Sequence, residues 1–263
     1  TIGSYAFNGC TTKTSISTPS TLRVVGNYAF NDCSFITSIV ISEGVTRIGF
    51  RSFQNCQNLE RIVIPESVTY IDEGAFVDCD KLASISLPSG ITTITNAMFS
   101  SCNSLTDIVI PEGVTSIDAY AFNYCTALKN IVIPNGVTSI GDYAFRNCVA
   151  LKSVVIPNGV TSIGGEAFVD CRALESIAIP DSVTSIGKYA FQSCWNLKNI
   201  VIPKNLSVIE YGMLYGCSSL TSVVIPDGVT KIENYAFYGC VNLVSVSIPS
   251  SVKSIGMFVL ADC

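Results

Sequence analysis

Cysteine is the residue of this 263-residue chain whose spacing suggests chemistry. The twelve cysteines run from Cys10 to Cys263, and each lies 23 residues from the next. Thiols in such a series are able to form disulfides or bind a metal. Neighbours stacked at the strand spacing of about 4.8 Å fall within the Cα separation that a disulfide tolerates, so distance alone leaves pairing open.

The orientation of the side chains argues against disulfide pairing. Cysteine side chains at the same position of stacked repeats point in the same direction, not toward each other. The chain also has no Cys-x-x-Cys motif, which a metal site of thiolates usually contains. We therefore expect each cysteine to be a small, buried, reduced thiol that closes one repeat. The sequence predicts no metal and no cofactor.

The other residue types do not assemble a catalytic centre. Histidine, the commonest general base, is absent. Carboxylates recur at two turn positions of the repeat, one just after a proline and one further along, as in Glu66, Asp181, Asp72 and Asp118. Glycines occupy turn positions as well, so no phosphate-binding loop is present. We expect the protein not to be an enzyme.

The fixed period organises the whole chain. Residues 10–262 are eleven full repeats, residues 1–9 are a partial repeat, and no insertion or deletion interrupts the series. A period of this length predicts a solenoid in which each repeat contacts only its neighbours. We therefore expect residues 1–263 to form a single solenoid domain. Because the chain starts and stops within a repeat, we expect it to be a piece of a longer protein.

One repeat, Cys125 to Asn147, reads CTALKNIVIPNGVTSIGDYAFRN, and we number its positions from the cysteine as zero. Apolar residues at +6 and +8 alternate with period two, which predicts a half-buried strand. The proline at +9 ends this strand, because it has no N–H to donate. We expect a second short strand at +13 to +15, and then one α or 3₁₀ turn that carries the Ala-Phe pair inward. We expect the hydroxyls of the threonines at +13 to form hydrogen bonds with polar groups at the corner of the coil.

Composition excludes two classes of partner. The net charge is −5 and only 13% of residues are charged, so the chain has no basic surface for nucleic acid. Proline and polar residues interrupt every repeat, so no segment is long enough to insert into a membrane. We expect a monomer.

Three outward positions of the first strand form the predicted binding face. Position +7 is a series of valines, which either marks an interaction surface or reflects the preference of valine for strands. Position +5 is polar, and position +4 gathers several lysines. The predicted contact residues are Lys129, Asn130, Val132, Lys152, Val155, Lys198, Asn199 and Val201. Trp195 is a second candidate contact.

The consensus C-x-x-L-x-x-I-x-I-P-x-x-V-T-x-I-x-x-x-A-F-x-x resembles the BspA-like class of leucine-rich repeats over essentially the whole chain. The resemblance implies a right-handed α/β solenoid whose principal strands line a concave sheet. It also implies a cell-surface or secreted protein of the kind that adheres to host matrix proteins or cells. Departures at the Ala and Phe positions suggest local repacking; they are Ser52, Met98, Met213, Leu214 and Leu260.

Two functional hypotheses follow. The first is an extracellular, adhesin-like scaffold that binds a protein or glycan, including host matrix or cell-surface molecules, on its concave face. The second is a structural spacer that presents another domain and has no ligand of its own. The near-identical repeats between Cys102 and Trp195 favour the spacer, because a binding face usually varies from coil to coil.

Overall fold

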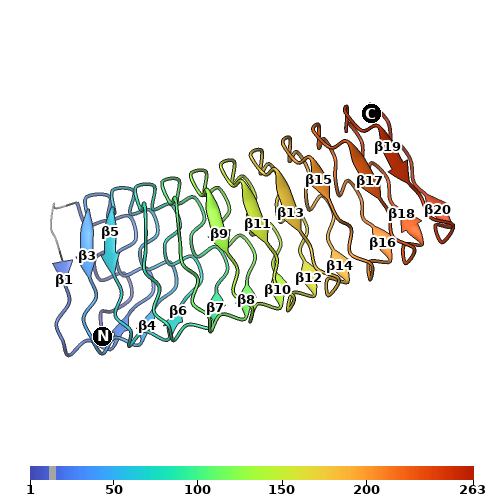
Figure 1. The fold of residues 1–263 in the computed structure, drawn as a ribbon. Helices are drawn as coiled ribbons and strands as arrows, with labels where there is room; N and C mark the ends of the chain where they lie inside the picture. The colour runs from blue at the N-terminus through green and yellow to red at the C-terminus, as the bar shows by residue number, and fades with distance from the viewer. Residues whose placement is uncertain (12–15) are drawn as a thin grey trace.

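The computed structural model describes residues 1–11 and 16–263, which wind into a right-handed parallel β-solenoid (Figure 1). Paired strands are offset by one repeat, so that Ser153 lies opposite Asn130 and Ile163 lies opposite Ile140. The 23-residue period of the sequence is therefore the length of one coil. The partners of a strand therefore come from adjacent coils.

The principal strands form the first ladder. They alternate between exposed and buried residues, and the inward side chains of Ile131 and Ile133 are 5% and 4% exposed. Proline follows each three-residue strand after one further residue, as predicted, except after β3 (Ser38–Val40), where Ser42 takes its place. The principal strands are β1 (Ile16–Ser17), β3 (Ser38–Val40), β5 (Arg61–Val63), β9 (Asn130–Val132), β11 (Ser153–Val155), β13 (Ser176–Ala178), β15 (Asn199–Ile200), β17 (Ser222–Val224) and β19 (Ser245–Ser247).

The second ladder confirms the second predicted strand, although each strand has two residues and occupies only +14 and +15. Its last residue is the inward isoleucine or valine, buried in every strand but the final one. The strands are β2 (Val24–Val25), β4 (Arg47–Ile48), β6 (Tyr70–Ile71), β7 (Thr93–Ile94), β8 (Ser116–Ile117), β10 (Ser139–Ile140), β12 (Ser162–Ile163), β14 (Ser185–Ile186), β16 (Val208–Ile209), β18 (Lys231–Ile232) and β20 (Ser254–Ile255).

The predicted helical turn is wrong: the described residues contain no helix, and the Ala-Phe segment is a run of turns. Tyr143 and Asn147 have φ values of 59° and 58°, in the left-handed region that ends a right-handed helix. The N–H groups of Tyr143, Phe145 and Asn147 each donate to a carbonyl of the next coil, at 2.8–2.9 Å. The segment is therefore a third inter-coil ladder, which a helix could not form because its N–H groups bond within the segment.

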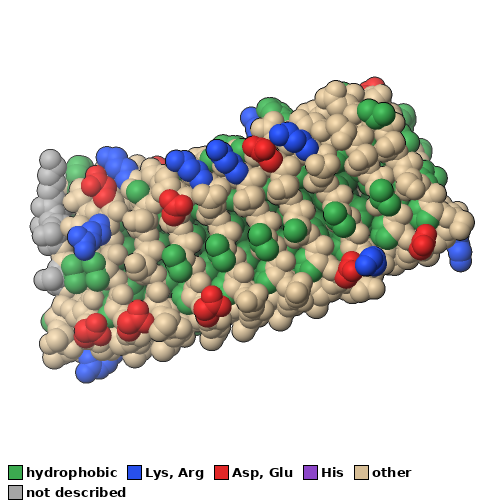
Figure 2. All heavy atoms as spheres, in the orientation of Figure 1, with side chains coloured by type: hydrophobic (Ala, Val, Ile, Leu, Met, Phe, Trp, Pro, Cys, Tyr) green, Lys and Arg blue, Asp and Glu red, His purple; other side chains and the backbone are tan. Residues whose placement is uncertain are grey.

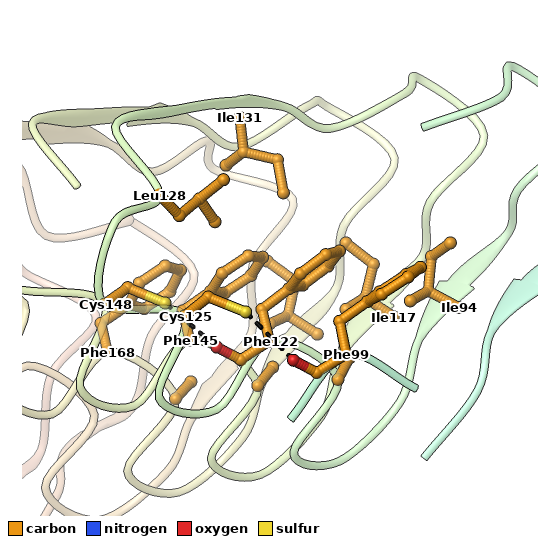
Figure 3. Packing of buried hydrophobic residues seen from close by; sticks show 14 of the residues in the cluster. Ile94, Phe99, Ile117, Phe122, Cys125, Leu128, Ile131, Phe145, Cys148 and Phe168 are labelled. Atoms are coloured by element: carbon orange, nitrogen blue, oxygen red, sulfur yellow. Dashed lines mark hydrogen bonds between the residues drawn. The ribbon is translucent and has the colours of Figure 1, made fainter. Parts of the chain in front are cut away.

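Aromatic rings fill the centre of the stack. Phenylalanines at +20 are fully buried and lie face to face in successive coils, with ring centroids 5.3 Å apart for Phe122 and Phe145 (Figure 3). Stacked and offset rings add attraction beyond the area that they bury. At the Ala position, Ser52 is also fully buried, and its hydroxyl has no hydrogen-bond partner.

The cysteines form a ladder of thiols beside these rings, as predicted. Cys33 to Cys240 are buried, and none of the described cysteines takes part in a disulfide. Cys125 and Cys148 donate to the carbonyl oxygens of Phe99 and Phe122 at 3.2 Å (Figure 3). Removal from water raises the pKa of Cys33 to about 11 and that of Cys240 to about 12, and it raises the pKa of Cys102 and Cys148 well above the usual value.

The second ladder is interrupted at two places, between β6 and β7 and between β14 and β16. In both cases the coil that follows the gap has a fully buried methionine, Met98 or Met213, where alanine is usual. In most coils the backbone N–H at +13 donates to the +13 carbonyl of the preceding coil, as in Thr115 to Thr92 at 2.8 Å and Thr138 to Thr115 at 2.9 Å. Within the described residues, this hydrogen bond is missing at both gaps.

The turn ladder stays closed at the same two places. Phe76 N–H donates to the carbonyl of Met98, and Phe191 N–H donates to that of Met213, both at 3.0 Å. The methionine side chain is longer than that of alanine, and overfilling a packed core forces the backbone to move. Coils that contain a buried methionine at this position therefore lack the backbone bond on the strand side and keep those on the turn side.

Replacing Met98 by alanine should close the first gap. In the native protein, the amide of Thr92 should exchange its hydrogen faster than that of Thr115, because it makes no bond to the preceding coil. In Met98→Ala, Thr92 should gain protection, which amide hydrogen exchange by NMR measures. Met213→Ala is the matched control and should protect Ser207 while Thr92 stays unchanged. Unchanged exchange at Thr92 in Met98→Ala would contradict the role of the methionine.

The thiol ladder should make the protein sensitive to alkali. An unfolded thiol ionises near pH 9, whereas the pKa of buried Cys33 is about 11 and that of Cys240 is about 12. Unfolding therefore releases protons, and the stabilisation that is complete below pH 9 is lost as pH rises through the folded pKa. Each fully buried thiol changes the free energy of unfolding by about 1.4 kcal/mol per pH unit in that range.

Urea denaturation between pH 7 and pH 10.5 measures this effect. The wild-type free energy of unfolding should fall steeply above pH 9. A variant with Cys102, Cys125 and Cys148 replaced by alanine should have a lower free energy of unfolding at pH 7. Above pH 9, that free energy should fall less per pH unit than in the wild type. Equal slopes for the two proteins would show that the thiols do not cause the alkaline loss.

Candidate functional site

The eight predicted contact residues lie on one face of the solenoid. Asn130 and Val132 belong to β9, Val155 to β11 and Asn199 to β15. Lys129, Lys152 and Lys198 each precede one of these strands, and Val201 follows β15; all eight residues are exposed. The in-register pairing of β9, β11, β13 and β15 brings them together over four consecutive coils.

Exposed valines form a ridge along this face, the valine ridge, made of Val40, Val63, Val109, Val132, Val155, Val201 and Val224. The side chains of Val132, Val155 and Val201 are 77%, 68% and 69% exposed. Figure 2 shows hydrophobic side chains in rows across this face. Ser86 and Ala178 interrupt the ridge. An apolar series of this length, bordered by polar residues, is the kind of surface that a partner can dehydrate on binding.

A row of lysines borders the ridge. The backbone at +4 continues the inter-coil ladder, with Lys152 N–H donating to the carbonyl of Lys129 at 3.1 Å, so the lysine side chains leave adjacent coils side by side. Lys198 Nζ lies 3.4 Å from the carboxylate of Glu175. Among the described residues, no ion pair involves Lys129 or Lys152. Figure 2 shows Lys and Arg side chains along the upper edge of the face.

Sequence reasoning missed a depression in this face. It lies where the principal sheet is irregular, because residues 84–86 and 107–109 pair with their neighbours only through the isolated bridges Ser86–Val109 and Val109–Val132. The depression has a volume of about 370 Å³ and is lined by Ser84, Ile85, Asp107, Ile108, Val109, Asn130, Ile131 and Val132. The available signal was the pair of departures Ser86 and Met98 in one repeat.

The threonines at +13 have a structural role. The hydroxyls of Thr115, Thr138 and Thr161 each donate to the +13 carbonyl of the preceding coil at 3.2 Å, which confirms the corner prediction. Trp195 is 45% exposed, and the guanidinium of Arg172 lies 4.3 Å from its ring centroid. This cation–π contact occupies one part of the ring that a partner would otherwise contact.

Two of the carboxylates from the turn positions hold adjacent coils together. Glu66 accepts hydrogen bonds from the backbone N–H and hydroxyl of Ser89, and the backbone bond is the main reason that the pKa of Glu66 is lowered. Asp181 accepts from the backbone N–H of Lys204 in the same way. Within residues 1–11 and 16–263, no cluster of three or more acidic or cysteine side chains has the arrangement of a metal site. The same residues contain no helix of the length and hydrophobicity that crossing a membrane requires.

Comparison with known proteins agrees with the coil geometry. The chain matches the model of the BspA type leucine rich repeat region in six copies, over residues 1–129, 115–243 and 209–263. A leucine-rich cell-surface protein from Faecalibacterium prausnitzii has a similar solved structure, with a TM-score of 0.66 and 34% identity over 99% of this chain and 80% of that one.

A second similar structure is that of a leucine-rich repeat protein from Bacteroides ovatus, with a TM-score of 0.62 and 26% identity over 95% of this chain and 84% of that one. A leucine-rich repeat protein from Treponema pallidum is 29% identical over 70% of this chain and 78% of its own, with a TM-score of 0.51. No curated protein sequence gives a significant match. The unbroken repeat, the 23-residue coil and these similarities together show that the chain belongs to the BspA-type leucine-rich repeat family.

Proposed function

We propose that this chain is a non-catalytic binding scaffold, displayed at a cell surface or secreted, and that the principal-strand face binds an acidic segment of a partner protein. The observation that carries the proposal is the valine ridge beside Lys129 and Lys152. The extracellular location is supported by the cell-surface protein of Faecalibacterium prausnitzii, which shares the fold at 34% identity.

The valine ridge supplies the attraction. Val109, Val132, Val155, Val201 and Val224 are each at least 68% exposed, and burying a valine side chain contributes roughly 1.5–3 kcal/mol. Several of these valines must be covered together to offset the loss of translational and rotational freedom on association. Because successive coils present them in register, an extended partner segment can cover several at once.

The lysines supply direction and specificity. The chain as a whole is acidic, with a net charge of −5, so an acidic partner is repelled by much of its surface. Lys129 and Lys152 project from adjacent coils beside the valine ridge and have no acidic partner among the described residues. Such a local cationic edge steers an acidic segment toward the ridge and accelerates association.

The alternative function is a structural spacer, and a specific observation favours it. The coils between Cys102 and Trp195 are nearly identical in sequence, whereas the coils of a binding face usually vary. A spacer needs only the three inter-coil ladders and leaves the valine ridge without a ligand. The two functions therefore differ in whether changes on this face alter an interaction.

Charge reversal separates these two functions. The labelled chain is first incubated with purified host matrix proteins and with a glycan array to identify a partner. A variant with Lys129, Lys152 and Lys198 changed to glutamate and Val132 and Val155 changed to threonine should then associate about tenfold more slowly at low salt. Its melting temperature should stay close to that of the wild type, because exposed substitutions typically cost under about 0.5 kcal/mol each.

The matched control reverses Lys188, Lys204 and Lys253, which are exposed and lie outside the +4 position. Each set of three reversals breaks one surface ion pair, Lys198–Glu175 or Lys204–Asp181, so the change in charge is equal, and the binding-face variant alone also carries the two Val→Thr changes. Only the first variant should lose binding. Equal affinity in all three proteins would refute the binding face, and capture by glycans alone would replace the acidic protein with a sugar ligand.

A further inference from the structure

The geometry points to an anchor site within the proposed binding face: we propose that the depression beside Val109 receives a tryptophan or tyrosine side chain of the partner protein. This inference rests on the proposed function and adds the place and the chemistry of the first contact. The depression is about 370 Å³, which accommodates one large aromatic side chain but not a folded element.

The lining of the depression is apolar below and polar at the rim. Ile85, Ile108 and Ile131 are each at least 93% buried and form the floor, and Val109 and Val132 stand exposed beside it. Asp107 and Asn130 are exposed lining residues with side-chain oxygen atoms that accept hydrogen bonds. An aromatic ring that carries an N–H or O–H donor matches both parts, and only tryptophan and tyrosine combine a large ring with such a donor.

The sheet explains why the depression lies at this place on the valine ridge. β5 and β9 are separated by two coils whose principal segments pair only through the bridges at Ser86, Val109 and Val132. Met98 is buried in the first of these coils, where the second ladder is also broken. Ala178 interrupts the ridge as well, but β13 around it keeps regular pairing on both sides, to β11 and to β15.

Charge indicates what flanks the aromatic side chain. Lys129 directly precedes Asn130 on the rim, and Lys152 extends the cationic edge in the next coil. Acidic residues that follow the anchor toward Lys129 and Lys152 would face these lysines. The site therefore fits a tryptophan or tyrosine with acidic residues beside it in the partner segment.

The test uses a defined probe, an acetylated and amidated Glu-Glu-Trp-Glu-Glu peptide, with the full chain. Binding is followed by methyl NMR, and the Ala-centred peptide of the same charge is the ligand control. The Trp peptide should bind about tenfold more tightly than the Ala peptide, which corresponds to about 1.4 kcal/mol. It should shift the methyl signals of Ile108, Val109 and Val132 and leave those of Val201 and Val224 in place.

A matched pair of variants localises the anchor. Val109→Thr with Val132→Thr makes the lining polar, and Val201→Thr with Val224→Thr makes the same change at similar exposure elsewhere on the valine ridge. The first variant should weaken the Trp peptide about tenfold, and the second should leave its affinity unchanged. Unaltered melting temperatures for both show that the fold is intact.

The outcomes separate this inference from the function on which it rests. Equal weakening by both variants, or shifts spread along the whole ridge, would overturn the anchor and leave the binding face standing. Equal affinity for the Trp and Ala peptides would overturn the anchor as well. If the anchor shifts appear but reversal of Lys129, Lys152 and Lys198 has no effect on the Trp peptide, the anchor stands and the acidic partner is wrong.

Discussion

The structure depends on backbone hydrogen bonds between residues one repeat apart. Three ladders make these bonds around each coil: the principal strands, the second strands and the left-handed turn segment. A coil satisfies some of its backbone groups in its own turns, such as Val137 N–H with the carbonyl of Pro134, but the groups of the three ladders would be left to water in an isolated coil. This is why an unbroken 23-residue period matters, because a single inserted residue would shift every inward side chain out of line with its neighbour.

Much of the fold could be predicted from local patterns. The alternation around Ile131, the proline that follows and the recurring cysteine each specify one local property, and the structure confirms all three. The turn segment could not be predicted in this way, because tyrosine at +18 is an unfavourable residue for the left-handed conformation that it adopts. The conformational cost of this tyrosine is offset by hydrogen bonds to the next coil. The sequence of a single repeat does not reveal those bonds.

The candidate site also has features that one repeat predicts and features that it does not. The exposure of Val132 and Lys129 follows from strand alternation, so their place on one face was predictable. The depression was not, because it arises from the relation between coils: it lies where the repeat that contains the buried Met98 and the repeat after it pair only through isolated bridges. In a solenoid of near-identical coils, residues that depart from the consensus thus indicate best where the surface of one coil differs from that of the others.

Removing whole coils measures the dependence on neighbours most directly. Chains shortened by one, two and three 23-residue repeats from the C-terminal end are compared with the full chain by urea denaturation. If the inter-coil ladders supply the stability, the free energy of unfolding should fall by a similar amount with each coil and extrapolate to a negative value for one coil. A free energy that stays constant as coils are removed would contradict this account.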